Sequence, residues 1–126
     1  MTRRLWLWGP AIAQMALIFA ISSLHNAPIP DGVSDHVGHS VGYFILAVAM
    51  FRGFAGGAWA GVTWRSGALA VGFSVLYGMS DEVHQSFVPG RLPAWDDVRA
   101  DFYGALIGAA LVGILYIINK LWPTRT

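Results

Sequence analysis

The sequence predicts an all-α integral membrane protein, a bundle of four transmembrane helices that forms a single domain over residues 1–126. Three observations lead to this fold class. Hydrophobic residues make up 56% of the chain and charged residues only 12%, against roughly 25% charged residues in soluble domains. Long uncharged stretches recur along the chain, and the acidic residues gather at one side of these stretches. A soluble chain of 126 residues could not cover so much apolar surface, and its length leaves no room for a second domain.

The apolar stretches give the approximate bounds of the helices. We expect them over residues 5–24, 37–54, 66–87 and 101–122. The first is uncharged over 20 residues, about one bilayer crossing. This run is longer than the apolar core of a cleaved signal peptide, which usually has ~7–15 residues. The only basic or acidic side chains in the second stretch are His39 and Arg52. The uncharged part of the third is short, so this helix has to continue through the polar residues after Ser80. The fourth is uncharged over residues 102–119.

The lysines and arginines indicate the orientation of the helices. The amino-terminal side of the predicted bundle carries Arg3, Arg4, Arg52, Arg65, Lys120 and Arg125. Only Arg91 and Arg99 fall on the other side. Because cytoplasmic loops carry an excess of basic residues, the expected topology is N-in/C-in. Five tryptophans near the same boundary fit an interfacial aromatic belt. These are Trp6, Trp8, Trp59, Trp64 and Trp122.

The acidic residues and histidines fall at or near the opposite, extracytoplasmic side. The carboxylates are Asp31, Asp35, Asp81, Glu82, Asp96, Asp97 and Asp101, and the histidines are His25, His36, His39 and His84. Charge at membrane depth is costly, so it normally lines a bundle interior or a water-filled cavity and marks a working site. The sequence therefore predicts a pocket that faces the extracytoplasmic side.

The third helix carries the centre of this predicted pocket. Tyr77, Asp81 and Gln85 recur at four-residue spacing and share a face, and Glu82 borders it. Adjacent carboxylates in a poorly hydrated place repel each other, so one should hold a proton or share a cation. We expect Asp81 and Glu82 to be catalytic, as general acid and base, and Gln85 to bind ligand. Alternatively, these carboxylates have only a structural role, in which they pair with Arg91 or accept hydrogen bonds from a neighbouring helix.

The second helix places Asp35, His39 and Tyr43 on one face at intervals of four residues. Asp35 and Tyr43 are candidate ligand-binding residues, although Asp35 could equally cap the helix. His39 lies inside the apolar run and needs a partner. It could be a ligand, a catalytic proton shuttle or a satisfied core histidine, and we favour a functional role. For His25 and His36 we expect a plain surface role.

The last candidates lie in the loop after the third helix and at the start of the fourth. Arg91 could clamp a phosphate or carboxylate, or merely neutralise the neighbouring acids. Asp96 and Asp97 open the fourth helix, where acids complement the helix dipole. Asp97 and Asp101 continue in one stripe with two glycines and are candidate ligand-binding residues. The glycine pairs Gly104–Gly108 and Gly38–Gly42 suit close helix packing, within the chain rather than in a dimer.

Several classes of chemistry are excluded or left open by the composition. The chain has no cysteine, which excludes disulfides and thiolate sites. The net charge of +1 argues neither for nor against nucleic-acid binding, but the sequence has no basic cluster or stripe that would bind it. The carboxylates and imidazoles could hold a divalent cation, but no HExxH or similar motif specifies a metal. Four serines lie near the extracytoplasmic side, but no nucleophile elbow frames them, which disfavours a serine hydrolase.

Taken together, the motifs resemble those of the VanZ-like family of small bacterial membrane proteins. The first stretch ends in Ser22 and Ser23, as in that family. The matching motifs, in order, are Asp35, His39 and Tyr43 for Asp-x3-His-x3-Tyr; Asp81, Glu82 and Gln85 for Asp-Glu-x-x-Gln; and Asp97, Gly104 and Gly108 for Asp-x3-Asn-x2-Gly-x3-Gly. The likeness spans nearly the whole chain. Asp101 stands where the family usually has asparagine, which adds charge to the pocket.

The resemblance implies a multi-pass protein of the bacterial plasma membrane, and the founding member of the family is associated with low-level teicoplanin resistance. We therefore expect a cell-envelope protein whose pocket binds a lipid-linked or amphiphilic molecule and affects glycopeptide susceptibility. A membrane hydrolase or phosphatase acting on a lipid head group or polyprenyl phosphate is an alternative. In it, His39 carries protons, Gln85 orients and Arg91 clamps phosphate. A small transporter that uses the carboxylates as relays is a second alternative.

Overall fold

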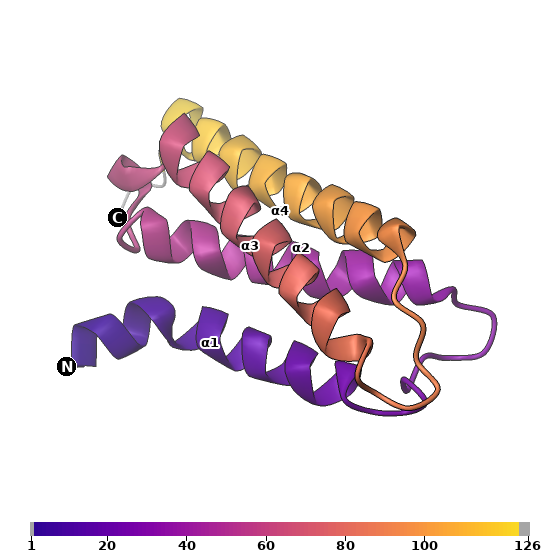
Figure 1. Cartoon of the computed structure of the whole chain (residues 1–126). Coiled ribbons are helices and arrows are strands. Elements are labelled where there is room, and N and C mark those ends of the chain that lie inside the picture. The colour runs from indigo at the N-terminus through magenta and orange to yellow at the C-terminus, as the bar shows by residue number, and fades with distance from the viewer. Residues whose placement is uncertain (1, 124–126) are drawn as a thin grey trace.

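The computed structural model describes residues 2–123 and consists of four long helices that lie side by side (Figure 1). The helices are α1 (Thr2–Ser22), α2 (Asp35–Phe54), α3 (Trp64–Gln85) and α4 (Trp95–Leu121), with a short 3-10 helix η1 (Trp59–Gly61) before α3. Residues 2–123 contain no β-strand. The predicted all-α, four-helix fold is confirmed. Arg125, one of the basic residues behind the predicted topology, lies outside the described residues.

The largest difference from the predicted bounds is at the start of α4. The helix begins at Trp95, not at residue 101, so Asp96 and Asp97 occupy its first turn. The bounds taken from apolar residues left this turn out, although the helix-dipole argument had placed Asp96 and Asp97 at the opening of the helix. The carboxylates are stable there because the free backbone N–H groups and the helix dipole favour negative charge at an N-terminus. At the start of α3, Thr63 and Ser66 form a capping box that sets the first residue of the helix.

Three of the four helices, α1, α2 and α4, are long and apolar enough to cross a membrane. Helix α3 is not among them, since its last two turns carry Asp81, Glu82, His84 and Gln85, but it has 22 residues and lies alongside the others (Figure 1). Large apolar side chains cover the outside of the bundle. Leu76 and Ile107, for example, are each 60% exposed. Helices with such surfaces need lipid around them, and the chain is a multi-pass membrane protein.

Helix α2 is the central element of the bundle, and its closest neighbour is α4. A Cβ atom at Gly104 would lie 2.1 Å from the backbone oxygen of Ser40, and one at Gly108 would lie 2.6 Å from that of Phe44. Only glycine permits this approach, so the Gly104–Gly108 pair makes the predicted close helix contact within the chain. Gly38 and Gly42 face Ile29 and Ile18 instead, on the side of α1.

Helix α1 packs mainly against α2 and makes few contacts with α3; in Figure 1 its end lies beside the end of α3, and its start lies further from the other helices. Specific polar contacts hold it. The Tyr77 hydroxyl of α3 donates a hydrogen bond to the Met15 backbone oxygen at 2.7 Å. The Gln14 amide donates to the Gly42 backbone oxygen at 3.0 Å. Near the start of α1, the Arg52 guanidinium lies over the Trp6 ring, 3.8 Å from its centroid.

The two ends of the bundle differ in charge. The connecting segments 23–34 and 86–94 lie at one end (Figure 1). This end, with the adjoining turns of α2, α3 and α4, holds all seven acidic residues and all four histidines of the chain, and we call it the acidic end. The start of α1, η1 and the last turns of α2 and α4 lie at the opposite end. That end carries Arg3, Arg4, Arg52, Arg65 and Lys120.

Candidate functional site

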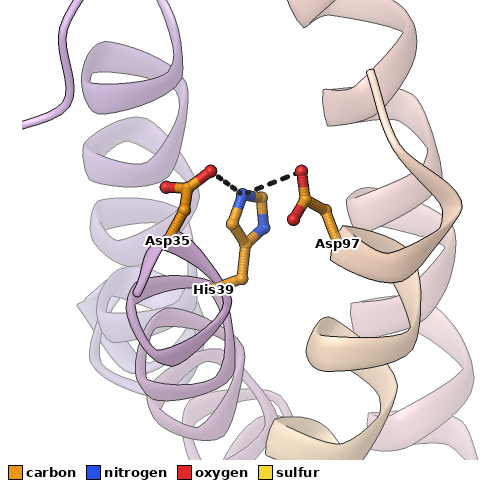
Figure 2. Close-up of side chains that lie close together, drawn as sticks. All are labelled: Asp35, His39 and Asp97. Carbon is orange, nitrogen blue, oxygen red and sulfur yellow. Dashed lines mark ion pairs between the residues drawn. The ribbon is translucent and has the colours of Figure 1, made fainter. Parts of the chain in front are cut away.

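His39 is the centre of a polar cluster between α2 and α4 at the acidic end. Its Nδ1 atom lies 2.9 Å from Oδ1 of Asp101. Its Nε2 atom faces the other way and lies 3.9 Å from an oxygen of Asp35 and 3.9 Å from one of Asp97 (Figure 2). The His39 side chain is only 9% exposed, and its hydrogen bond with Asp101 fixes the orientation of the ring.

Asp97 and Asp101 come from successive turns of α4, and both are buried. The second oxygen of the Asp97 carboxylate accepts from His36, with Nδ1 at 2.9 Å. Asp101 is completely buried, and its Oδ2 atom has no hydrogen-bond partner among residues 2–123. Gly78 of α3 makes room for this carboxylate, because a Cβ atom there would come within 2.5 Å of Oδ2.

Asp81 forms a second polar cluster between α1 and α3. The Ser22 hydroxyl, at the end of α1, donates to Oδ1 of Asp81 at 2.6 Å. The Gln85 amide donates to Oδ2 at 2.9 Å, and the Gln85 carbonyl oxygen accepts from Arg91 at 2.8 Å. A chain of hydrogen bonds therefore runs from α1 through α3 to the loop before α4.

Glu82 is adjacent to Asp81 in the sequence but contacts a different element. Its Oε2 atom accepts a hydrogen bond from the backbone N–H of Ala94, the residue that precedes α4, at 3.0 Å. Its Oε1 atom is buried without a partner among the described residues. The two carboxylates therefore do not form one acid pair: Asp81 lies against α1 and Glu82 against the start of α4.

A cavity of about 420 Å³ lies between α1, α2 and the segment that joins them. Its wall combines apolar side chains of α1 and α2 with polar groups of the acidic end. The polar lining residues are Gln14, Ser22, Asp35, His39, Tyr43, Asp81, Gln85 and Arg91. A second, more open hollow of about 440 Å³ shares Asp35, Gln85 and Arg91 with the first and is also lined by His25. The cavity thus has an apolar body and a polar mouth at the acidic end.

Arg91 is the cation at the mouth of this cavity. Among residues 2–123 it forms no ion pair with a carboxylate, and its one side-chain hydrogen bond goes to Gln85. Arg99, by comparison, pairs with Asp96 on the surface at 3.1 Å. The Arg91 guanidinium therefore does not neutralise Asp81 or Glu82, which was one of the two roles considered for it from the sequence.

Most residues singled out from the sequence meet at the acidic end. Asp35, His39, Tyr43, Asp81, Gln85 and Arg91 line the same cavity. Asp97 and Asp101 lie behind His39, while Glu82 lines a separate hollow between α3 and α4. His25 and His36 are exposed, yet their rings contact the Pro89 backbone oxygen and Asp97 respectively.

Sequence reasoning missed two supporting residues. Ser22 was noted as part of a family-like ending and as one of the four serines near the extracytoplasmic side, but not as a partner of Asp81, to which it gives the shortest hydrogen bond. Gly78 was not noted at all, although it makes space for Asp101 and for the Tyr43 ring. The sequence did offer one signal for Gly78: it is a small residue about two turns before the end of α3, and polar residues flank it on the same helix.

Chemically, the site can do two things. Arg91, which the carbonyl oxygen of Gln85 orients, can bind an anionic group at the cavity mouth. The Nε2 atom of His39 and the facing oxygens of Asp35 and Asp97 can hold a cation, because the three atoms lie within 4.8 Å of one another (Figure 2).

Comparison with known proteins identifies the family. The family model described as VanZ/LLP1 matches residues 12–116, a range that includes the second half of α1, all of α2 and α3, and most of α4. Comparisons with curated proteins and with solved structures gave no match. Since the match spans most of the chain and includes every residue of the cavity mouth, the chain belongs to the VanZ/LLP1 family.

Proposed function

We propose that this protein binds an amphiphilic, lipid-linked molecule with an anionic head group at the extracytoplasmic face of the bacterial plasma membrane, and that it alters glycopeptide susceptibility. One observation carries the proposal. The same cavity joins an apolar wall of α1 and α2 to the guanidinium of Arg91, which is not paired with a carboxylate among the described residues. A ligand that fills it needs both an apolar chain and a negatively charged group.

The mouth of the cavity suits a phosphate or carboxylate head group. Arg91 presents a planar set of N–H donors, and its contact with Gln85 fixes its direction. Gln85 is almost completely buried and is fixed in turn by Asp81. A volume of about 420 Å³ falls in the range of small-molecule pockets, roughly 300–1,000 Å³, and accommodates a head group with the first part of its chain.

The apolar wall gives the chain of the ligand a lateral route. Leu17 of α1 and Val41 and Ile45 of α2 line the cavity and are each about half exposed. In a bilayer these side chains meet lipid, so an acyl or prenyl chain can enter between α1 and α2 from the side.

The orientation of the acidic end is part of the proposal and has its own test. The basic residues at the opposite end favour a cytoplasmic location for that end. Because the chain has no cysteine, single cysteines can report the side of the membrane. A membrane-impermeant maleimide applied to intact cells should label Asn26→Cys at the acidic end and spare Ala58→Cys at the opposite end. The reverse pattern would place the cavity in the cytoplasm and refute the proposed location.

Binding can be tested with purified protein in nanodiscs and a short polyprenyl phosphate. Loss of charge-assisted hydrogen bonds costs about 1.5–3 kcal/mol, so Arg91→Gln should raise Kd by about 10- to 100-fold. Arg99→Gln is the matched control, since Arg99 is 70% exposed and lies outside the cavity. The corresponding polyprenyl alcohol should bind weakly to all three proteins. Equal affinity of wild type and Arg91→Gln would refute the anionic site.

The cellular role can be tested in a glycopeptide-sensitive host that expresses the wild type, Arg91→Gln or Arg99→Gln at matched membrane levels. We expect wild type and Arg99→Gln to raise the inhibitory concentration of teicoplanin, and Arg91→Gln to leave it at the level of the empty vector. No change with any of the three proteins would remove the resistance part of the proposal and leave ligand binding to stand on its own measurement.

A hydrolase acting on the same class of ligand is the second candidate, and one observation favours it. Gln85 connects the candidate acid Asp81 to the candidate phosphate clamp Arg91, so a bound phosphate would lie near a carboxylate and near His39, which lines the same cavity. Release of inorganic phosphate from the polyprenyl phosphate, lost in Asp81→Asn but not in Asp96→Asn, would support it. Binding without turnover would assign the cavity to a binding protein.

A further inference from the structure

We propose that Asp35, His39 and Asp97 form a binding site for a divalent transition-metal cation such as Zn²⁺. The proposal goes beyond the amphiphile site and does not depend on it, because it rests on the cluster between α2 and α4. Three side chains from two helices point their donor atoms at one spot (Figure 2). One imidazole nitrogen and two carboxylate oxygens are a ligand set that suits borderline cations of this kind.

The distances fit a metal ion after a small adjustment. Ligand atoms of a tetrahedral Zn²⁺ lie about 2.0–2.2 Å from the metal and therefore about 3.4 Å from each other. Nε2 of His39 lies 3.9 Å from Oδ2 of Asp35 and 3.9 Å from Oδ2 of Asp97. These two separations thus each have to close by about half an ångström, and the separation of the two carboxylate oxygens, which lie within 4.8 Å of each other, by up to about 1.4 Å. Asp35 can supply its part of this movement, because it is the first residue of α2 and its side chain is 48% exposed.

The orientation of His39 is what distinguishes this cluster from a chance group of acids. Metal-binding histidines almost always donate their other ring N–H to a carboxylate or carbonyl, which fixes the tautomer and raises ligand basicity. Here Nδ1 of His39 is held by Asp101 at 2.9 Å. The Nδ1–H tautomer leaves the lone pair on Nε2, the atom that faces Asp35 and Asp97. The second oxygen of Asp97 is likewise held, by His36 at 2.9 Å.

A separate observation indicates that this region lacks positive charge. Asp101 is completely buried, and the carboxylate that it directs at His39 keeps one oxygen, Oδ2, without a partner among residues 2–123. Within the same part of the chain, no lysine or arginine forms an ion pair with Asp35, Asp97 or Asp101, so these three carboxylates share two imidazoles. Buried carboxylates are costly unless they are paired or coordinate metals, and a divalent cation at Nε2 of His39 would add positive charge beside Asp35 and Asp97. The Oδ2 atom of Asp101 lies on the Nδ1 side of the ring, against Gly78 of α3, so Asp101 orients the imidazole and is not itself a ligand.

The site is accessible to ligands. Asp35 and His39 also line the cavity between α1 and α2, whereas Asp97 closes the cluster from the side of α4. A cation there would have three protein ligands and an open position on the cavity side, the arrangement that zinc sites use when a water or substrate completes the coordination.

The test is equilibrium dialysis of purified full-length protein, carrying a histidine-free tag, against ⁶⁵Zn²⁺ in detergent without any amphiphilic ligand. We expect one Zn²⁺ per chain. His39→Gln and Asp35→Asn should weaken binding by about a hundredfold or more, and Asp101→Asn by about 10- to 100-fold, the usual effect of removing a partner that orients a ligand. Asp35→Asn is informative even if buried variants misfold, since the Asp35 side chain is half exposed.

Two matched controls guard against weak binding by surface groups. Asp96→Asn changes a carboxylate beside Asp97 that is 68% exposed and pairs with Arg99. His84→Gln changes a histidine of the acidic end that contacts Ser23 and Phe19 instead of the cluster. Both should bind Zn²⁺ like the wild type. Absence of binding by the wild type, equal binding by Asp35→Asn, or an equal loss in the controls would each overturn the proposal.

X-ray absorption of the zinc-loaded wild type gives a second, independent readout. The proposed ligands predict one imidazole, with oxygen atoms in the remaining positions. A spectrum with two or more imidazoles would overturn the proposed ligand set. Neither measurement uses the amphiphile, so failure of the metal site and failure of the proposed ligand binding are distinguishable.

Discussion

Replacing Gly104 with alanine should move α2 away from α4 and disturb the adjacent polar cluster around His39 and Asp101. A Cβ atom at this position would lie 2.1 Å from the Ser40 backbone oxygen and 2.8 Å from its carbonyl carbon. Real Cβ atoms essentially never approach other atoms closer than 3.0 Å, so the helices have to move apart by about an ångström. The obstacle is backbone, which cannot rotate out of the way as a flexible side chain can.

The loss of unfolding free energy caused by Gly104→Ala can be estimated from two opposing effects. Overpacking a tight contact costs typically about 1–3 kcal/mol, and the rigid obstacle places Gly104→Ala at the upper end. Alanine recovers up to about 1 kcal/mol through its higher helix propensity. The net loss of unfolding free energy is therefore about 1–2 kcal/mol. A shift of about an ångström also breaks the bond between Ser40 Oγ and the Ala100 oxygen, now 3.0 Å, and that between His39 and Asp101, now 2.9 Å.

The assay compares Gly104→Ala with Gly113→Ala on the same helix. A Cβ atom at Gly113 meets nothing within 4 Å, so this control keeps the propensity gain without the clash. Unfolding in detergent, followed by tryptophan fluorescence, should show Gly113→Ala at least as stable as the wild type and Gly104→Ala clearly less stable. Equal stability of the two variants would refute the close approach of α2 and α4 as the structure has it.

Two further substitutions test the polar contacts of α3. Ser22→Ala removes the hydroxyl that donates to the buried Asp81 and should lower the unfolding free energy by about 1–3 kcal/mol. Ser23→Ala changes an exposed neighbour and should alter the unfolding free energy by less than about 0.5 kcal/mol. Equal effects of the two substitutions in the same fluorescence assay would contradict the buried hydrogen bond. Glu82→Gln should leave the amount of protein in the membrane unchanged, because the amide oxygen can still accept from the Ala94 N–H. Glu82→Ala should reduce that amount, as measured by immunoblot. Failure of the glutamine variant to accumulate would show that the fold needs the charge of Glu82.

The fold and the make-up of the polar faces were predictable because both depend on local periodicity. Apolar runs gave four helices, and the four-residue spacing of Asp35, His39 and Tyr43 placed them on one side of α2, where the His39 and Tyr43 rings lie parallel within 5°. Asp81 and Gln85 likewise share one face of α3 and are hydrogen-bonded to each other. Such relations follow from 3.6 residues per turn and need no knowledge of neighbouring helices.

Partners across helices were not predictable, because the sequence does not say how the helices are rotated against one another. The bonds of His39 to Asp101 and of Ser22 to Asp81 join residues 62 and 59 positions apart. The divergence of Asp81 and Glu82 was foreseeable in part. Neighbouring residues on a helix point about 100° apart, so two adjacent carboxylates face different neighbours unless both lie at a broad interface.

The two proposed sites should influence each other, because they share the wall formed by Asp35 and His39. Without a cation, the Asp35 carboxylate lies on the same cavity as Arg91 and repels an anionic head group. A bound Zn²⁺ would neutralise the two carboxylates that hold it and offer its open position to a phosphate oxygen. Coupling between two binding equilibria is reciprocal, so Zn²⁺ should tighten polyprenyl phosphate binding by the same factor by which the lipid tightens Zn²⁺ binding. In Asp35→Asn the repulsion and the metal ligand are lost together, and the factor should fall to about one. A wild-type lipid affinity that does not respond to Zn²⁺ would mean that the metal and the head group occupy independent parts of the acidic end.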